Sequence, residues 1–439
     1  MERYTKYKDS GIAWLGEIPE HWECIKFKRL TPIKRGASPR PIADPVYFDP
    51  DGEYAWVRIA DVTASERYLE TTTQKLSELG KSYSVSLEPD ELFLSIAGSV
   101  GKPIITKIKC CIHDGFVYFP NLKANKEFVY YIFSTGQPYL GLGKLGTQLN
   151  LNTDTVGGIE IGLPPLEEQR SIAAYLDRKT AEIDELIAQK QRLIALYEEE
   201  KTAIINEAVT KGINPDVKLK PTAIDWLGDI PEHWKVKKLK YITPNITVGI
   251  VITPAKYYVD SGVACLRSLN VKENYLDNSN LVFISPESNE LLEKSKIHKD
   301  DLVAVRTGKP GTTAIVNEEF DGTNCIDLII IRKSNQILSI FLSLQLNSSF
   351  TKFQFSTGTD GAIQQHFNIE TACNIIVLLP PLEEQKAIAA YIEKETARID
   401  TKIAKTKRII ELQKEYRTAL ISEAVTGKIK IPDLTELDQ

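Results

Sequence analysis

The side chains that could do chemistry in this chain are few, and their spacing favours no familiar catalytic or metal site. Of the five histidines, His21 and His233 each lie in a repeated "PEHW", where packing beside the following tryptophan explains them better than catalysis. The other three, His113, His298 and His366, have no partners at metal-ligand spacing. The six cysteines form no CxxC pair and no repeated spacing, so neither a zinc site nor a disulfide framework is indicated. The sequence therefore predicts no metal, and a reducing cytoplasm fits its cysteines.

Two glycine-rich segments, "GSVGK" and "TGKPGTT", lack the GxxxxGK[ST] pattern of a phosphate-binding loop and stand among strand-like residues. They are better explained as tight turns in which Gly98, Gly101, Gly308 and Gly311 adopt positive φ. An adenine methyltransferase would need an Asn/Asp-Pro-Pro-aromatic loop, and the only Pro-Pro pairs belong to a repeated "LPPLEEQ". We therefore expect a chain that is not an enzyme and binds no cofactor of its own.

The size of the chain requires more than one domain to position these residues. Its 439 residues exceed the roughly 250–300 at which single cores stop growing. A composition of 42% hydrophobic and 26% charged residues is that of an ordinary soluble protein. The N-terminal residues lack the apolar region of a signal peptide, and apolar runs such as "NIIVLL" are too short to cross a bilayer. With a net charge of −5, any contact with nucleic acid must come from a local basic face.

The chain repeats itself at its domain edges. A tryptophan opens "WLGEIPEHW" at Trp14 and "WLGDIPEHW" at Trp226, which lies 212 positions later. The segment "LPPLEEQ" begins at Leu163 and again at Leu379, which lies 216 positions later. Each unit is thus an "IPEHW" segment, a variable body and a junction that leads into a long helical segment.

The two bodies differ in sequence but share a pattern of short apolar runs bounded by Gly, Pro and Asp, which is typical of strands joined by loops. "YAWVRIADVT", "ELFLSIAGSVGKPIIT" and "GFVYFP" in the first body correspond in place to "VACLRSLNVK", "DLVAVRTGKPGTTAIV" and "CIDLIIIRK" in the second. We predict an α+β protein with two mixed, mainly β domains.

Each "LPPLEEQ" opens a helix, because proline suits the first helical position and the paired glutamates that follow favour the helix dipole. The first helical segment has no internal Gly or Pro over about 45 residues, which makes a rod of roughly 65 Å. Apolar residues recur at seven-residue steps, the pattern of a coiled coil. The residues predicted at the helix contact are Leu176, Ile183, Ile187, Ile194, Tyr197, Ile392, Ile399, Ile403, Ile410 and Tyr416.

Helices of this length overhang bodies of about 140 residues, so we expect them to pair with each other, antiparallel and related by a pseudo-two-fold axis. The simpler alternative is that each apolar stripe packs only on its own body. The predicted domains are a first body, a central helix, a second body, a C-terminal helix and a tail that returns toward the N-terminal domain, with boundaries at 1–162, 163–211, 212–378, 379–427 and 428–439.

This arrangement resembles, over essentially the whole chain, the specificity subunit of type I DNA restriction-modification enzymes, and "LPPLEEQ" followed by "IAAYLDRKTAEID" is highly specific for that family. The resemblance implies that each body is a target-recognition domain that reads one half of a split site in double-stranded DNA. It implies that the helices form an antiparallel spacer on which two methyltransferase subunits dock, and that restriction (translocase) subunits can join. S-adenosylmethionine, and ATP with Mg, are then expected only on the partner subunits.

Within the bodies, side chains that can reach base edges or phosphates are the candidates for DNA contact. Arg58 and Arg267 stand at corresponding positions, the two glycine turns correspond, and so do two polar loops that precede the helices. An ion pair within the domain is the structural alternative for both arginines. The complete set of candidates is Lys34, Arg35, Arg58, Ser99, Lys102, Lys144, Thr147, Gln148, Asn150, Arg267, Arg306, Thr307, Lys309, Thr359, Gln364, Gln365 and His366.

Two other classes of function remain open from the sequence. A coiled-coil adaptor could join two protein partners without touching DNA, and its bodies would then carry no segregated positive surface. An enzyme with an unfamiliar site would show turnover as the purified chain alone.

Overall fold

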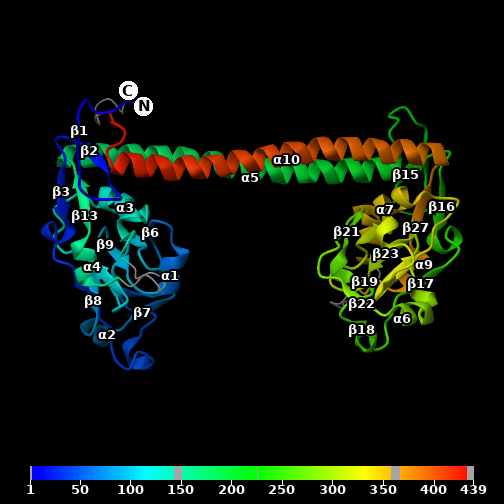
Figure 1. The fold of residues 1–439 in the computed structure, drawn as a ribbon, viewed down its shortest axis with the longest axis horizontal. Helices are drawn as coiled ribbons and strands as arrows, with labels where there is room; N and C mark the ends of the chain where they lie inside the picture. The colour runs from blue at the N-terminus through cyan, green and yellow to red at the C-terminus, as the bar shows by residue number, and fades with distance from the viewer. Residues whose placement is uncertain (1, 143–150, 225, 357–365, 433–439) are drawn as a thin grey trace. The chain divides into compact units, whose positions relative to one another are not determined.

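The computed structural model describes residues 2–142, 151–224, 226–356 and 366–432. The chain divides into two compact units, unit 1 (Met1–Lys190 with Arg408–Gln439) and unit 2 (Gln191–Lys407). The division passes through both long helices, so each unit consists of one β-rich body and one segment of each helix (Figure 1). Among the described residues, no helix combines the length and the apolar character that crossing a membrane requires.

Two helices are far longer than the rest, and their composition explains it. Both lack internal Gly and Pro, and each carries two glutamates in its first turn, where the helix dipole favours negative charge. The short helices of the bodies are commonly capped by Asn or Ser side chains. The helices are α1 (Ile59–Ala64), α2 (Glu78–Ser82), α3 (Lys126–Ser134), α4 (Thr153–Gly158), α5 (Leu166–Lys211), α6 (Pro286–Leu291), α7 (Ser339–Asn347), α8 (Ser349–Ser356), α9 (Ile369–Asn374) and α10 (Leu382–Val425).

The body of unit 1 contains two principal sheets, with strand orders β4-β12-β9-β10-β6 and β7-β5-β11-β8. Two further pairs, β1-β2 and β13-β3, lie at the "IPEHW" and "LPPLEEQ" junctions. The strands are β1 (Tyr7–Asp9), β2 (Glu17–Pro19), β3 (Glu23–Lys26), β4 (Lys34–Arg35), β5 (Tyr54–Val57), β6 (Tyr68–Leu69), β7 (Gln74–Leu76), β8 (Val85–Leu87), β9 (Leu92–Ser95), β10 (Pro103–Thr106), β11 (Cys110–Ile112), β12 (Phe116–Tyr118) and β13 (Glu160–Leu163).

The body of unit 2 repeats this plan with the orders β17-β26-β23-β24 and β18-β22-β19-β25, and its junction pairs are β14-β15 and β16-β27. The small pair β20-β21 is added. The strands are β14 (Leu219–Pro221), β15 (Asp229–Pro231), β16 (Lys235–Lys238), β17 (Ile246–Val248), β18 (Tyr258–Val259), β19 (Val263–Leu266), β20 (Val271–Lys272), β21 (Tyr275–Leu276), β22 (Val282–Ile284), β23 (Leu302–Val305), β24 (Thr313–Ile315), β25 (Asn324–Cys325), β26 (Leu328–Ile331) and β27 (Ile376–Leu379).

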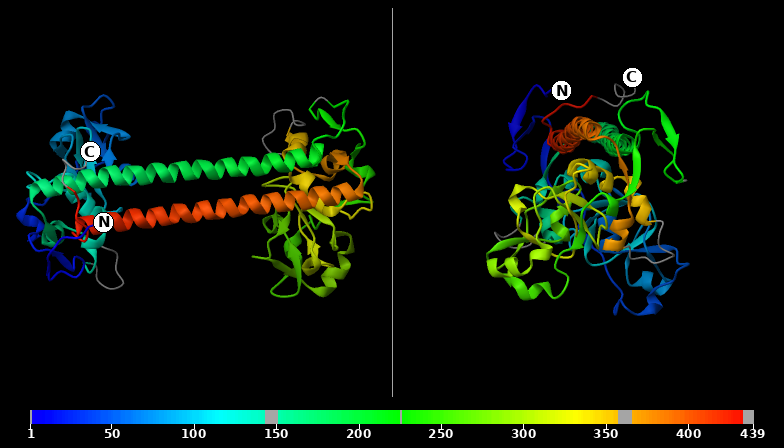
Figure 2. Two further views of the ribbon diagram at one scale, coloured as in Figure 1. Left: turned by 90° about the horizontal axis from the view of Figure 1, so that it is seen from above. Right: turned by 90° about the vertical axis from the view of Figure 1, so that its right-hand side faces the viewer.

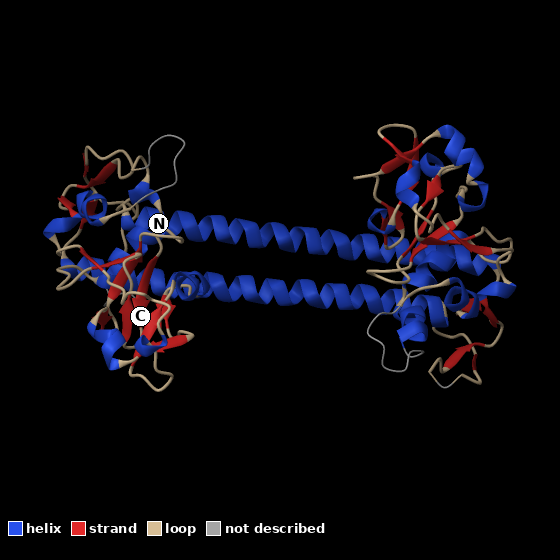
Figure 3. Ribbon diagram, turned by 90° about the horizontal axis from the view of Figure 1, so that it is seen from below, coloured by secondary structure: helices blue, strands red, loops and turns tan. Residues whose placement is uncertain are grey.

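The central strands consist mainly of consecutive apolar residues, because both of their faces are packed against other parts of the body. Every residue of β9 and of its counterpart β23 is buried, which is the pattern of a strand with packing on both faces. Strands and short helices are mixed in each body, whereas the stretch of paired helix carries no strand (Figure 3). This confirms the α+β prediction.

The repeated sequence edges form one repeated hydrogen-bond cluster. In unit 1, His21 Nε2 and Glu168 Oε2 are 2.8 Å apart, and Trp22 Nε1 donates to Glu168 Oε1 at 3.0 Å. In unit 2, His233 and Trp234 bond Glu384 in the same way, at 2.7 and 3.0 Å. Both tryptophans are fully buried. The segments "PEHW" and "LPPLEEQ" therefore occur twice because, in each unit, their hydrogen bonds join the body to the start of one long helix.

In each unit the start of one long helix packs against the end of the other. In unit 1, Leu176 and Ile183 of α5 share a core cluster with Leu420 of α10. In unit 2, Ala208 of α5 shares a cluster with Ile392 of α10. Figure 2 shows the two helices side by side. The predicted antiparallel pairing is confirmed, and the alternative in which each stripe packs only on its own body is wrong.

The contacting residues follow alternating steps of three and four, the spacing of a coiled-coil seam. All the predicted seam residues except Tyr416 lie on these steps, and their burial ranges from complete at Leu176 and Ile399 to partial at Ile187, Ile194 and Tyr197. The seam is Leu176, Thr180, Ile183, Ile187, Lys190, Ile194, Tyr197, Lys201, Ile204 and Ala208 on α5, and Ile392, Thr396, Ile399, Ile403, Thr406, Ile410, Gln413, Arg417, Leu420 and Ala424 on α10.

Tyr416 is a correction to the predicted seam. Its side chain is 45% exposed, because it lies one residue away from the seam position, which is taken by Arg417. The Arg417 guanidinium instead reaches across to Asp184 of α5, with Nε–Oδ1 and Nη2–Oδ2 distances of 2.9 and 3.1 Å. In unit 2 the equivalent seam cation, Lys201, bonds Asp400 of α10 at 2.7 Å.

Candidate nucleic-acid interface

The glycine-rich segments are tight turns with left-handed glycines. In unit 1 the turn joins β9 to β10, and Gly98 and Gly101 have φ of +66° and +84°. In unit 2 the turn joins β23 to β24, and Gly308 and Gly311 have φ of +92° and +82°. The positive φ predicted for all four glycines is confirmed, and glycine adopts it without the steric cost that a Cβ would bring.

The two turns also share their hydrogen bonds, which gives a residue-by-residue correspondence. Gly101 N donates to Ser95 O at 2.8 Å, and Gly311 N donates to Val305 O at 2.9 Å. One residue further on, Lys102 N bonds the carbonyl of residue 99 and Thr312 N bonds that of residue 309, both at 3.2 Å. Ser99 of unit 1 thus corresponds to Lys309 of unit 2, and Lys102 corresponds to Thr312. The backbone is common, and the basic side chain stands at a different position in each unit.

In unit 1 the turn is packed against α1. Gly98 lies so close to Ile59 that an added Cβ would be 2.5 Å from its Cγ2. The Thr63 hydroxyl lies 2.6 Å from that of Ser99. Lys102 donates to the main-chain carbonyls of Thr63 and Ser65, and partial burial lowers the pKa of its ammonium group. Lys102 is therefore already bonded within the unit, where a cation suits the end of a helix.

Arg58 and Arg267 occupy equivalent places, directly after β5 and β19. The backbone N–H of each donates to the side chain three residues later, at 2.9 Å to Asp61 and 3.0 Å to Asn270. The Arg58 guanidinium pairs with Asp61 at 3.4 Å and bonds Thr73, whereas that of Arg267 donates to Asn280 O at 2.7 Å. Arg58 thus forms an ion pair within its own domain, which is the alternative to DNA contact for this residue.

A third equivalent pair is the loop that follows β4 and the loop that follows β17. Gly36 N donates to Phe116 O at 3.0 Å, and Gly249 N donates to Leu328 O at 2.8 Å. Both glycines sit against backbone, since an added Cβ would lie 2.2 Å from His113 O at Gly36 and 2.4 Å from Cys325 O at Gly249. Neither position can accept a larger residue without a backbone shift. The loops at 36–41 and 249–254 are therefore held at the same place in the two bodies.

The basic residues of the unit 1 loop gather around Asp114, which precedes β12. Arg35 Nε donates to the Asp114 carbonyl, while Ser38 and Arg40 reach its carboxylate at 3.2 and 3.4 Å. Lys34 and Arg35 are exposed on β4. Since Ile96 N bonds Gly115 O at 2.8 Å, this cluster lies beside the start of the glycine turn.

In unit 2 the corresponding place holds Arg306, which pairs with Asp327 just before β26. Arg306 also anchors the segment that follows the second polar loop, because its carbonyl accepts from Phe367 N at 3.0 Å. His366, next to Phe367, is exposed, as is Lys309, and Thr307 is half-buried. The Arg306 Nε is buried without a hydrogen-bond partner.

The structure thus brings most of the described candidates of each unit to one end of the sheet that contains β9 in unit 1 and β23 in unit 2, which we call the glycine-turn end. Two features of it meet in both units, namely the glycine turn and the loop after β4 or β17, while the arginine after β5 or β19 follows a strand of the second sheet. Seven candidates lie outside the described residues, namely Lys144, Thr147, Gln148, Asn150, Thr359, Gln364 and Gln365.

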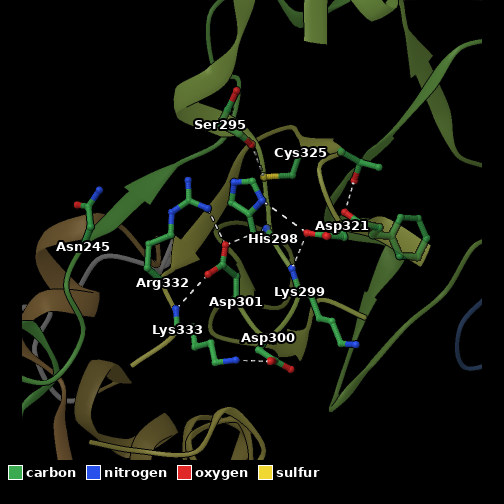
Figure 4. A network of polar contacts seen from close by, with 12 residues as sticks. Asn245, Ser295, His298, Lys299, Asp300, Asp301, Asp321, Cys325, Arg332 and Lys333 are labelled. Carbon is green, nitrogen blue, oxygen red and sulfur yellow. Dashed lines mark hydrogen bonds and ion pairs between the residues drawn. The ribbon is translucent and has the colours of Figure 1, made fainter. Parts of the chain in front are cut away.

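The opposite end of β23 has a different character (Figure 4). There Asp301 is buried and accepts from Arg332 Nη1 at 2.6 Å, from His298 N at 2.9 Å and from Lys333 N at 3.0 Å. A carboxylate with three donors is a satisfied structural group. His298 also lies 3.5 Å from Asp321. Over the described ranges no group of three or more His, Cys, Asp or Glu side chains is placed to hold a metal ion.

Sequence reasoning missed the acidic partners that position the arginines. Asp327 stands immediately before β26 in "CIDLI", and Asp114 stands two residues before β12 in "HDGF". An acidic residue before this strand in both bodies could have predicted an ion pair. In an antiparallel sheet, the residues before one strand lie beside the residues that follow its neighbour. Asp61 could also have been found, as it stands at the same spacing from Arg58 as Asn270 from Arg267.

Comparison with known proteins agrees with this duplicated architecture. The family described as type I restriction modification DNA specificity domain matches residues 19–195 and 231–413, which together are more than half of the chain. The chain belongs to this family of type I restriction-modification specificity subunits.

Curated relatives and solved structures cover nearly the full length. The MjaVIII specificity subunit of Methanocaldococcus jannaschii is 24% identical over 435 residues, 95% of each chain. The EcoBI specificity subunit of Escherichia coli is 23% identical over 388 residues, 85% of this chain and 79% of that one. In fold, the chain is similar to a chain solved in a type I R-M system (TM-score 0.70, 15% identity, 93% and 98% covered). The HsdS subunit of Thermoanaerobacter tengcongensis is a further neighbour (TM-score 0.56, 17% identity, 93% and 98% covered).

Proposed function

We propose that this chain is the non-catalytic DNA-recognition subunit of a type I restriction-modification complex, and that each unit reads one half of a split, asymmetric site at its glycine-turn end. The observation that carries the proposal is the pairing of a common backbone with unlike side chains. The two turns have the same φ signs and hydrogen bonds, but the basic residues are Lys102 in one and Arg306 and Lys309 in the other. A shared frame that presents different donors suits two readers of different base sequences.

Two methyltransferase subunits are the proposed partners of the helix pair. Away from the seam, both helices expose a leucine at equivalent positions on the two repeats. Leu196 of α5 is 58% exposed and Leu412 of α10 is 44% exposed. Ile409 of α10 is 39% exposed beside Leu412, whereas its α5 counterpart Leu193 is half-buried. Equivalent positions on the two repeats would take two copies of one partner, and restriction subunits would join through that assembly.

The remaining chemistry is assigned to the partners. S-adenosylmethionine, and ATP with Mg, would bind to the methyltransferase and restriction subunits, and this chain would carry no cofactor. The complex would act on DNA in the cytoplasm.

The proposal is tested by exchanging one body in the assembled methyltransferase. Residues 23–162 are replaced with the matching body of another family member, and methylated adenines are mapped across a genome. We expect one half of the recognised sequence to change while the other half persists. Exchange of the second body is the matched control and should change only the other half. An unchanged methylation pattern would overturn the proposal.

The alternative of a protein adaptor without DNA contact makes a different prediction. Binding by the assembled complex would then not respond to DNA sequence. Specific DNA binding should instead weaken steeply as salt rises, because phosphate contacts release counterions. A titration from low to high salt therefore separates the two.

A further inference from the structure

Two large aliphatic side chains stand in solvent at the glycine-turn end of unit 2. Val251 is 47% exposed and Ile252 is 76% exposed. They lie in the loop that follows β17, ahead of a 3-10 helix that begins at Pro254. Single exposed apolar residues are common, but adjacent ones in the loop next to Arg306 need a reason.

The loop is held from both sides, so these side chains cannot simply turn inward. Ile250, which precedes them, is buried and exchanges backbone hydrogen bonds with the strand-end segment, as Ile250 N donates to Cys325 O at 2.8 Å and Ile250 O accepts from Asp327 N at 3.1 Å. Thr253, which follows them, has φ of +45°. A β-branched residue in the left-handed region is a strained outlier, and such strain collects at functional sites. Asp327 is also the partner of Arg306, so the aliphatic pair and the arginine are neighbours.

The equivalent loop of unit 1 has a contrasting composition. The correspondence of Gly36 with Gly249 places Ser38 opposite Val251 and Pro39 opposite Ile252, and unit 1 also carries the cations Arg40 in this loop and Arg35 at the end of β4. These donors gather around Asp114, whose carbonyl accepts from Arg35 and whose carboxylate accepts from Ser38 and Arg40. Unit 1 thus presents the donors of Ser38 and Arg40 in the loop where unit 2 presents the methyl groups of Val251 and Ile252.

We propose that Val251 and Ile252 contact the 5-methyl groups of thymines in the half-site bound by unit 2, beside a base or phosphate held by Arg306. This inference rests on the proposed function. The thymine methyl is the apolar feature among the base edges of the major groove, and apolar side chains are its natural partners. A loop with fixed ends and a strained Thr253 would present the two side chains to it without further ordering.

The experiment replaces the thymines of a bound duplex with deoxyuridine one at a time, which removes only the methyl group. Binding is measured for the assembled methyltransferase complex with wild type, Val251→Ala and Ile252→Ala chains. We expect at least one thymine, in one half-site only, whose replacement weakens wild-type binding by about threefold to tenfold, as burial of a methyl group implies. For the Ile252→Ala chain the same replacement should have almost no effect.

Leu219→Ala is the matched control, because Leu219 is 45% exposed in the same unit but lies on β14 at the "IPEHW" junction. It should keep the full response to deoxyuridine. Specific binding that is indifferent to every thymine methyl, or a response that Ile252→Ala leaves intact, would overturn this inference and leave the proposed function standing. Loss of all sequence-dependent binding by the wild-type complex would instead overturn the proposed function.

Discussion

The glycine turn of unit 1 and that of unit 2 have the same backbone and different side chains at their surface. Gly98 and Gly308 have positive φ, and the strands that precede them, β9 and β23, are buried throughout. The residue after each of these glycines is Ser99 in one unit and Lys309 in the other. Burial and backbone conformation restrict which residues can occupy the strands and the turn glycines, whereas the exposed positions of the turn are free to differ between the units.

The junctions show the opposite behaviour, because they retain both frame and side chains. Glu168 and Glu384 accept the same two hydrogen bonds with nearly the same lengths. A buried tryptophan N–H without its acceptor would carry a desolvation penalty. The histidine, tryptophan and glutamate therefore remain alike in the two copies, although Glu168 of unit 1 also accepts from the Tyr4 hydroxyl at 2.5 Å.

The largest expected effect tests whether the junctions stabilise each unit separately. Trp22→Ala should destabilise unit 1, and Trp234→Ala should destabilise unit 2, each by about 3–5 kcal/mol, because a fully buried tryptophan is lost. Amide hydrogen exchange resolves the two units in the full chain. An equal loss of protection in both bodies from either variant would contradict the view that each junction serves its own unit.

A smaller effect separates the two glycine-turn ends in DNA binding. Arg306→Ala should weaken binding to the specific site by about 1–3 kcal/mol, the range for one good base contact. Lys102→Ala should affect DNA binding much less, since its partly buried ammonium group bonds two main-chain carbonyls at the end of α1, whereas the Arg306 guanidinium has further N–H donors beyond the Nη1 that bonds Asp327. Both are measured by titration of labelled duplex at fixed salt, with unfolding temperatures as the control. Equal losses of affinity would remove the distinction between the two turns.

The pH response should differ between the units, because His113 of unit 1 is partly buried, whereas the histidines that the structure describes in unit 2 are exposed. Burial lowers the pKa of His113, and Arg35 lowers it further while Asp114 opposes the shift. The unfolded chain therefore binds this proton more readily than the folded one. The stabilisation is complete above about pH 6.5, the unfolded value, and is lost as pH falls below it.

This response is measured by hydrogen exchange between pH 7.5 and 5.5. We expect unit 1 to lose protection on acidification and His113→Gln to reduce that loss. Unit 2 is the internal comparison, since burial raises the pKa of the Cys325 thiol far above this window. A pH dependence of unit 1 that His113→Gln leaves unchanged would show that other groups titrate there.

The smallest effect concerns the seam cations. Asp184→Asn removes the carboxylate charge that Arg417 bonds through Nε and Nη2, and Asp400→Asn removes the one that Lys201 Nζ bonds at 2.7 and 3.0 Å. Both pairs are partly exposed, so each loss should lie near 0.2–1 kcal/mol, with the larger value for the bidentate arginine pair. Thermal unfolding at low and high salt measures this, since salt screens exposed charges. Effects that persist in high salt would contradict a mainly electrostatic contribution.

Much of the fold could be predicted because its signals are local or repeated. The helix openings, the seven-residue steps and the positive φ of Gly98 and Gly308 depend on residue type and spacing alone. The sequence misplaces Tyr416, because a tyrosine is by residue type a better seam candidate than the charged residue next to it. The seam position belongs to Arg417, whose Asp184 partner lies on the other helix and could not be read from α10.

The sequence by itself determined the duplication, the class of fold, the antiparallel helix pair and the residue types available to contact DNA. Repeats and hydrophobic periodicity can be recognised from the order of residues alone. Only the tertiary structure decided which of those residues meet and which are free. It bonded Lys102 to a helix end, placed Asp327 beside Arg306 and left Ile252 in solvent. These outcomes depend on contacts between strands far apart in the chain, where burial and hydrogen bonding are settled by three-dimensional neighbours.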